Sequence, residues 1–146
     1  MVHFVKSFMS QTTITPEIAK LFEGKNLVSF ATLMKDGSPH VAPVWVDLDG
    51  NTILINTAIG RVKEKNVKKD KRVALSIFDH QNPYNMVSIR GKVIDLTTEG
   101  ADEHIDKLAK KYFGLDKYPY RSPDEKRVIV KIIPEKIFHM QPPPQK

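Results

Sequence analysis

The sequence of 146 residues contains no cysteine, and this absence excludes several kinds of chemistry. A chain without thiols forms no disulfide, no thiolate nucleophile and no zinc or iron–sulfur site with cysteine ligands. Long apolar runs are also missing, since none approaches the roughly 18 residues that a membrane-spanning helix needs. The N-terminal residues 1–6 lack the charged and apolar regions of a secretion signal. We therefore expect a soluble, cytoplasmic protein without a membrane partner.

Motifs that mark common catalytic and nucleotide-binding sites are absent as well. Neither of the glycine-rich phosphate-loop patterns occurs, which argues against nucleoside triphosphate hydrolysis and against a Rossmann cofactor site. There is no Gly-x-Ser-x-Gly elbow. The five histidines are scattered without the spacing of metal ligands (His3, His40, His80, His104 and His139). His80 beside Asp79 is better interpreted as a solvated loop pair than as an acid–base pair. The residues thus predict no metal site and identify no catalytic group.

What is present indicates one globular domain. A chain of this length buries roughly 68–70% of the surface that its unfolded form exposes, which is enough for a substantial core. The content of 40% hydrophobic and 27% charged residues is close to the globular average. We assign residues 1–140 to this domain and expect residues 141–146, which contain three consecutive prolines, to form a disordered tail.

The pattern of apolar residues and turns predicts a mainly β domain of the α+β class. Six strands are expected, over 27–33, 39–48, 52–57, 72–78, 86–96 and 127–133. Helices are expected from Thr15-Pro16-Glu17 to Gly24, in the basic segment after residue 61, and from Thr97-Thr98-Glu99 to Gly114. Tight turns between strands favour one antiparallel sheet with meander or barrel topology.

Two kinds of residue inside the expected strands carry positional information. Pro39 and Pro43 cannot donate to a strand ladder, so their strand should be bulged or lie partly at an edge of the sheet. Gly91 interrupts the alternation of its strand and predicts a bulge or bend there. A loop marked by Asn82-Pro83 is expected over 79–85, and a second loop over 115–126.

The most informative segment follows the third expected strand. Residues 52–56 end in a small polar turn, and a lysine-rich helix begins with Arg61, Lys63 and Lys65 near its first turn. A helix start exposes unpaired N–H groups and the positive end of the helix dipole, so it favours anions and disfavours cations. Cations at this end are explained by a bound phosphate. A merely solvated basic face is the alternative.

The net charge of +6 and the aromatic residues leave further alternatives. A nucleic-acid interface over 63–72 is less favoured, because this basic segment is short and lacks interleaved aromatic residues. Tyr112, Tyr118 and Tyr120 could stack on bases, but they follow an amphipathic helix and are better interpreted as packing residues. Trp45, the only tryptophan, is favoured as a core or dimer-interface anchor over direct stacking on a ligand.

Taken together, several segments resemble the flavin-binding split-barrel superfamily of pyridoxamine 5′-phosphate oxidase-like proteins. These segments are LMKDGSPHVAPVWV at 33–46, NTAIGRVK at 56–63 and RVAL at 72–75. The segment RVIVKIIPEK at 127–136 resembles the closing strand of the subgroup that uses FMN or the deazaflavin coenzyme F-420. The similarity extends over about residues 27–140, and its specificity lies in the order and spacing of the segments.

This resemblance implies a six-stranded antiparallel split barrel that forms a homodimer, with two cofactors, FMN or F-420, in clefts between the subunits. The cofactor ring is expected along Val41, Ala42, Pro43, Val44 and Trp45. The phosphate is expected at Asn56, Thr57, Arg61 and Lys63, with Lys65 as a further candidate. The other subunit is expected to complete the site with His80, Tyr84, Asn85 and Met86.

The resemblance also implies a function, which is hydride transfer between the bound cofactor and an unidentified small molecule. In such an enzyme the cofactor carries the chemistry, so the missing catalytic group is no objection. The alternative is a flavin-binding carrier or sensor without turnover. Vitamin B6 oxidation is not expected, because the B6 oxidases carry a C-terminal extension with Trp, Arg and His groups, whereas residues 138–141 here read Phe-His-Met-Gln.

Overall fold

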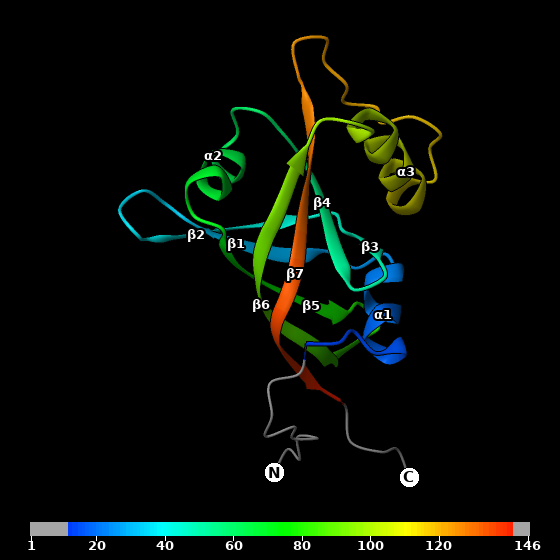
Figure 1. Ribbon diagram of the computed structural model, residues 1–146. Coiled ribbons are helices and arrows are strands. Elements are labelled where there is room, and N and C mark those ends of the chain that lie inside the picture. Colours follow the sequence, from blue (N-terminus) through cyan, green and yellow to red (C-terminus); the bar gives the residue numbers. More distant parts are fainter. Residues whose placement is uncertain (1–11, 142–146) are drawn as a thin grey trace.

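The computed structural model describes residues 12–141, which form three helices and one antiparallel sheet of seven strands (Figure 1). The helices are α1 (Pro16–Glu23), α2 (Val62–Lys69) and α3 (Ala101–Phe113). The strands are β1 (Val28–Leu33), β2 (Pro39–Val44), β3 (Asp47–Asp49), β4 (Thr52–Ala58), β5 (Arg72–Asp79), β6 (Asn82–Thr97) and β7 (Arg127–Met140). Residues 142–146 of the expected tail lie outside the described residues. No helix between residues 12 and 141 is long and apolar enough to cross a membrane.

The strands follow the order β2-β1-β5-β6-β7-β4-β3, so β2 and β3 form the two edges of the sheet. The edge position predicted from Pro39 and Pro43 is confirmed for β2. The register of the long strands β6 and β7 shifts twice, between Arg90 and Gly91 and between Val93 and Asp95, and the sheet is curved (Figure 1). A Cβ at Gly91 would lie 2.7 Å from the carbonyl oxygen of Ile133, so this close approach requires glycine. The irregularity predicted at Gly91 is confirmed.

Inside the curved sheet lies one hydrophobic core, and α1 contributes to it. Thr15 caps this helix by accepting from the amide of Ile18 at 3.3 Å, and Gly24 ends it, as predicted. Ile18 and Phe22, one turn apart, are buried against strand residues such as Phe30. The three-to-four-residue spacing of the apolar positions thus gives α1 one face that fits the core.

The structure divides the predicted strand 39–48 into β2 and β3, which accounts for seven strands in place of six. The break lies at Trp45–Val46. The amide of Val46 donates to the phenol oxygen of Tyr112 at 3.2 Å, and its carbonyl accepts from Lys111 Nζ at 2.9 Å. Because these backbone groups bind side chains of α3, they cannot continue a strand ladder. A sequence pattern of apolar residues does not reveal such distant partners.

Three smaller predictions were wrong at element boundaries. The expected loop 79–85 is a tight hairpin, in which Asn82 already pairs with Asp79. The final strand does not stop at Pro134, because this proline lies opposite the bend at Gly91 and β7 continues to Met140. Helix α3 is not capped by residues 97–99, since its N-cap is Gly100, in a left-handed conformation with φ 75°. The predicted end of α3 at Gly114 is confirmed.

The outer face of the sheet, opposite the core, carries exposed apolar side chains. Val41 of β2, Phe78 of β5 and Phe138 of β7 are 63%, 50% and 46% exposed. Between them lie small residues, including the register-paired Ala31 and Ala74 of β1 and β5. We call this surface the outer sheet face. At its centre, small side chains occupy neighbouring positions on adjacent strands.

Candidate functional site

The end of β4, the start of α2 and the start of β7 meet at one place in the fold, near the top of Figure 1. Thr57 and Ala58 of β4 pair with Val128 and Arg127 of β7, and the chain then turns directly into α2. We call the polar and charged side chains gathered here the cationic corner (Thr57, Arg61, Lys63, Glu125 and Arg127). The sheet register therefore brings Arg127, distant in sequence, to the predicted phosphate residues.

Thr57 is the most buried polar residue of the cationic corner, with 2% of its surface exposed. Its hydroxyl oxygen has no hydrogen-bond partner among residues 12–141. A buried hydroxyl without a partner costs about 1–3 kcal/mol, and a native fold retains such a group only where something compensates for this cost. The hydroxyl thus fits a site that an oxygen-rich ligand completes.

Three cations lie in the corner, and Glu125 pairs with two of them, Arg61 and Arg127. The buried carboxylate of Glu64, in the first turn of α2, accepts from the amide of Gly60 at 2.8 Å and pairs with Lys68 at 3.1 Å. Burial, followed by the charges of Arg61 and Arg127, lowers the pKa of Lys63. Arg61 occupies the N-cap position of α2 and makes no side-chain capping hydrogen bond. The three cations therefore disfavour one another, two of them at the start of α2, and an anion placed between them would relieve this repulsion.

Arg127 is a candidate site residue that the sequence analysis missed. Its side chain is 7% exposed, donates to Asn56 Oδ1 at 2.8 Å and forms an ion pair with Glu125. Its guanidinium also lies 5.3 Å from the ring centre of Tyr118. No local motif marks Arg127, because it follows a long loop. Only the pairing of β7 with β4 shows that it belongs to the cationic corner.

Asn56, a predicted phosphate residue, is engaged by neighbouring elements of the same chain. Its side-chain nitrogen donates to the carbonyl of Ala101 at 2.9 Å and lies 3.1 Å from His104 Nδ1, while its oxygen accepts from Arg127. His104 in turn lies 3.0 Å from Asp47. Asn56 therefore connects Arg127 to the start of α3.

Asp47 anchors the far end of this polar network. Burial raises the pKa of its carboxyl, but hydrogen bonds from His104, from the amide of Leu48 and from Lys107 lower it more. The net result is a pKa well below the usual range. Asp47 therefore stays charged near neutral pH and holds α3 against β3.

The residues predicted to contact the cofactor ring lie along the free edge of the sheet. In β2, Val41 and Pro43 point to the exposed side, whereas Ala42 and Val44 are half-buried opposite Phe30 and Val28. His40 Nδ1 is buried and lacks a partner within the described part of the chain. Because β2 pairs with β1 on one side only, its other side has no neighbouring strand.

Trp45 uses its ring within the chain. Its ring stacks on that of Tyr112 with centres 5.2 Å apart and an interplanar angle of 5°. The rings of Phe113 and Tyr118 meet Trp45 edge-on. The packing role expected for Trp45 and for the tyrosines of this region agrees with these contacts.

Within one chain, the remaining predicted residues do not join the cationic corner. Lys65 is exposed on α2. His80, Tyr84, Asn85 and Met86 lie at the β5–β6 hairpin, toward the lower end of the molecule in Figure 1, away from α2. Tyr84 is 66% exposed, and Asn85 Oδ1 lies 2.8 Å from His139 Nε2.

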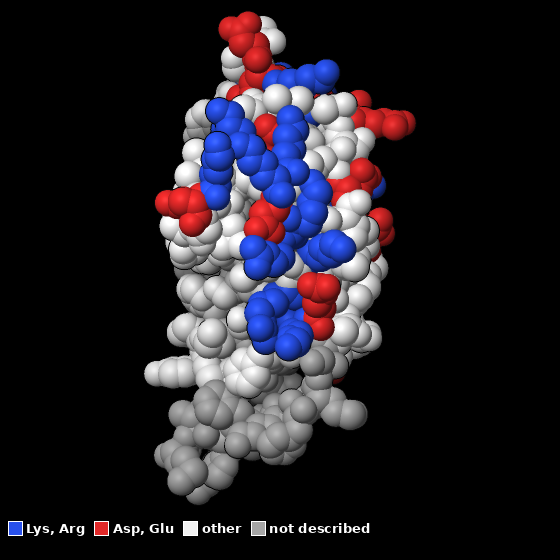
Figure 2. Space-filling model, turned by 60° about the vertical axis from the view of Figure 1, so that its left-hand side comes forward, with Lys and Arg blue, Asp and Glu red and all other residues white. Residues whose placement is uncertain are grey.

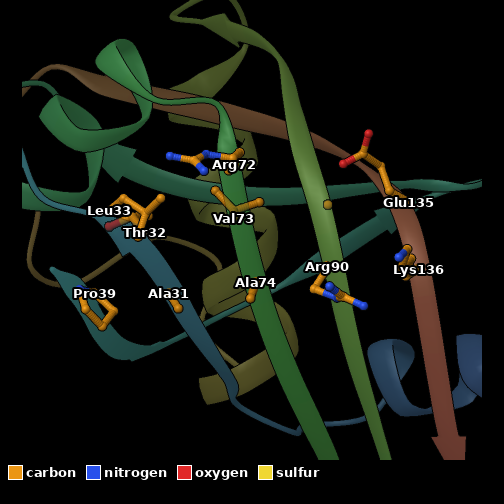
Figure 3. Close-up of a pocket in the computed structure, with 11 residues that line it drawn as sticks. Ala31, Thr32, Leu33, Pro39, Arg72, Val73, Ala74, Arg90, Glu135 and Lys136 are labelled. Carbon is orange, nitrogen blue, oxygen red and sulfur yellow. The ribbon is translucent and has the colours of Figure 1, made fainter. Parts of the chain in front are cut away.

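A pocket of about 360 Å³ opens on the outer sheet face (Figure 3). Ala31, Ala74 and Gly91 form part of its lining, and the cations around it are Arg72, Arg90 and Lys136. In Figure 3 Arg72 lies toward α2, and the other two cations lie further along the strands. Figure 2 shows Lys and Arg side chains gathered on the face that carries α2. On the face shown in Figure 2, basic side chains thus outnumber acidic ones near α2.

Comparison with known proteins agrees with this fold and site. The family model "Pyridoxamine 5′-phosphate oxidase" matches residues 14–141, so the chain belongs to the pyridoxamine 5′-phosphate oxidase family. A solved structure of an F420 reductase is 29% identical, with a TM-score of 0.72, covering 81% of this chain and 93% of that chain. The match confirms the predicted family and the split-barrel fold.

A further solved structure shows the same fold at lower identity. It is a putative pyridoxamine 5′-phosphate oxidase from Listeria innocua, 23% identical with a TM-score of 0.65. The alignment covers 85% of this chain and 95% of that chain. A search of curated proteins found no match.

Proposed function

We propose that the protein is an oxidoreductase that binds FMN or the deazaflavin F-420 and transfers a hydride between this cofactor and a small molecule. The family includes flavin- and F-420-dependent oxidoreductases, and the similarity to an F420 reductase supports this class. When bound, the cofactor supplies the hydride chemistry. The chain itself contributes a phosphate-binding site and a surface for the ring. A second copy of the chain completes the cofactor site.

The observation that carries this proposal is the buried, unpartnered hydroxyl of Thr57 at the end of β4, the strand that leads into the cationic start of α2. FMN and F-420 both carry a phosphate, whose oxygens accept hydrogen bonds from a hydroxyl, from a helix N-terminus and from cations. Arg61 and Lys63 stand at the start of α2, where a phosphate is also favoured by the helix dipole. The residues present therefore fit the phosphate end of either cofactor.

A homodimer is part of the proposal, because the outer sheet face suits a second copy of this chain. Val41, Phe78 and Phe138 are exposed around a centre of small residues, and burying such side chains is worth roughly 1.5–3 kcal/mol each. In a dimer through this face, the β5–β6 hairpin of one subunit could reach the site of the other. This arrangement gives His80, Tyr84, Asn85 and Met86 a role that they do not have within one chain.

Titration of purified protein with FMN and with F-420 tests the proposed phosphate-binding site. The double variant Arg61→Ala/Lys63→Ala should bind the preferred cofactor about 100-fold more weakly or worse, because each charge-assisted hydrogen bond contributes about 1.5–3 kcal/mol. The control Lys25→Ala/Lys69→Ala removes two exposed lysines and the same charge, and should change affinity little. Equal affinity in wild type and in Arg61→Ala/Lys63→Ala would refute the proposed site.

Turnover is tested separately from binding. The protein loaded with the preferred cofactor is mixed with candidate electron acceptors and donors, and reduction and reoxidation of the cofactor are followed by absorbance. An oxidoreductase shows multiple turnovers that depend on the added small molecule. Tight binding without such turnover would instead identify a carrier or sensor.

A further inference from the structure

Glu125 lies between two of the cations that the proposed function assigns to the phosphate. The same oxygen, Oε1, accepts from Arg61 at 3.2 Å and from Arg127. A carboxylate between two guanidinium groups has the charge and the hydrogen-bonding geometry of a small bound oxyanion. In the free protein the chain thus supplies its own anion to the cationic corner.

We propose that Glu125 occupies the position that a phosphate-bearing ligand takes, so that Arg127 is a third cation of the phosphate site and Glu125 limits its affinity for anions. This inference rests on the proposed function and extends it to two residues that the family motif does not mark. Binding of the phosphate releases Arg61, and in part Arg127, from Glu125.

The backbone around Glu125 is held in place, so the exchange involves its side chain. The amide of Glu125 donates to the carbonyl of Ser122 at 3.1 Å, and the carbonyl of the next residue, Lys126, accepts from Ile59 at 2.9 Å. These contacts hold the loop beside Ile59, the residue that follows β4, and keep the carboxylate close to Arg61. The internal anion is therefore always present at the site as a competitor.

The side chain has space to withdraw. Glu125 and Arg127 line a pocket of about 350 Å³ that also includes Tyr118, Arg121 and Ser122. Arg121 lies on this side of the loop and pairs with Asp106 at 2.6 Å. Asp102 also lines this pocket and lies 3.5 Å from Arg121, so a carboxylate that leaves Arg61 moves into a polar pocket of mixed charge instead of an apolar one.

Arg127 is fixed independently of Glu125, which suits it to hold a ligand. Its Nε donates to Asn56, which is held by Ala101 and His104 of α3. When Glu125 moves away, the guanidinium keeps its position through Asn56. Its remaining N–H groups can then bind phosphate oxygens.

The test compares the binding of FMN, riboflavin and inorganic phosphate by wild type and by Glu125→Gln. Glutamine keeps the shape and still accepts from Arg127, but it removes the competing charge. We expect Glu125→Gln to bind FMN and phosphate about tenfold more tightly. Riboflavin, which lacks the phosphate, should bind equally to both.

The matched control is Asp124→Asn, which removes one negative charge from the exposed neighbouring residue. A general effect of net charge would tighten FMN binding equally in both variants and would overturn the proposal. Unchanged or weaker FMN binding in Glu125→Gln would also overturn it. A gain confined to Glu125→Gln and to phosphate-bearing ligands supports it.

Arg127 is tested by Arg127→Lys, which keeps the charge but cannot bind Asn56 and a ligand through one planar group. We expect about tenfold weaker FMN binding with riboflavin unchanged. FMN binding as tight as in wild type would remove Arg127 from the site. The shift of the thermal midpoint with inorganic phosphate gives a readout that does not need a flavin, so failure of the proposed cofactor and failure of this inference can be told apart.

Discussion

The phenol oxygen of Tyr112 accepts a hydrogen bond from the backbone amide of Val46 at 3.2 Å, and this contact joins the end of α3 to the break between β2 and β3. The same oxygen donates to the carbonyl of Asn26 at 2.7 Å. One side chain thus satisfies two backbone groups from separate parts of the chain. Burial raises the pKa of Tyr112 to about 12, so the donor is present at physiological pH.

Replacing Tyr112 with Phe should lower the free energy of unfolding by about 1–3 kcal/mol, because two backbone groups lose their partner while the ring stack on Trp45 remains. Denaturant unfolding measures the change. Tyr120→Phe removes a hydroxyl from a side chain that is 67% exposed and should have little effect. Equal stability of Tyr112→Phe and wild type would show that the phenol contacts do not hold the strand break.

The lowered pKa of Lys111 predicts that the stability of the protein depends on pH. Burial lowers the pKa of its ammonium to about 8, from an ordinary value of 10.5. Between these values the unfolded chain carries a proton that the folded chain has lost, so the free energy of unfolding rises with pH over this window. Below pH 8 both states are protonated and the contribution is constant.

The Lys111→Met variant removes this titration. We expect the unfolding free energy of wild type, minus that of Lys111→Met, to increase as the pH rises from 8 to 10. Denaturant titrations at several pH values measure the difference. Lys110→Met, at an exposed neighbouring position, should show no such trend. A difference that stays flat or falls over this window would contradict a lowered pKa for Lys111.

Thr57 should have opposite effects on stability and on binding. Thr57→Val removes a buried hydroxyl without a partner, so the free protein should be as stable as wild type or more stable. Its affinity for the preferred cofactor should fall about tenfold, since one hydrogen bond to the phosphate is lost. Thr57→Ser retains the hydroxyl and should keep most of the affinity. If Thr57→Val kept the full cofactor affinity, Thr57 would not be a residue of the phosphate-binding site.

The outer sheet face predicts the oligomeric state. The wild-type protein should be a dimer in analytical ultracentrifugation, and Ala74→Glu should shift it toward monomer, because a buried unpaired charge costs several kcal/mol. Leu115→Glu places the same charge at an exposed loop position outside this face and should leave the dimer intact. A monomeric wild type, or a dimer unaffected by Ala74→Glu, would contradict this interface.

Local sequence signals gave most of the elements correctly. The cap of α1 at Thr15, the end of α3 at Gly114 and the edge position of the strand with Pro39 follow from chain chemistry within a few residues. The start of the basic helix that follows Thr57 was also predicted from the local sequence. The errors lie where a distant group takes over a backbone bond, as at Val46.

The residues of the candidate site also fall into two groups, those with a local sequence signal and those without one. Arg61 and Lys63 could be predicted as site residues because cations are unfavourable at a helix start. This signal lies within one short segment of sequence. Arg127 and Glu125 carry no such signal, because each is an ordinary residue in its own segment. They become neighbours of Arg61 only when β7 pairs with β4.

By itself, the sequence determined the strand and helix content, the family and the place of the basic helix start, because propensity, capping and spacing act over a few residues. Only the tertiary structure decided that Glu125 stands between Arg61 and Arg127, that Asn56 is held by α3 and that the hydroxyl of Thr57 is buried alone. Sheet register joins residues distant in sequence, and burial depends on what the whole chain packs around a group.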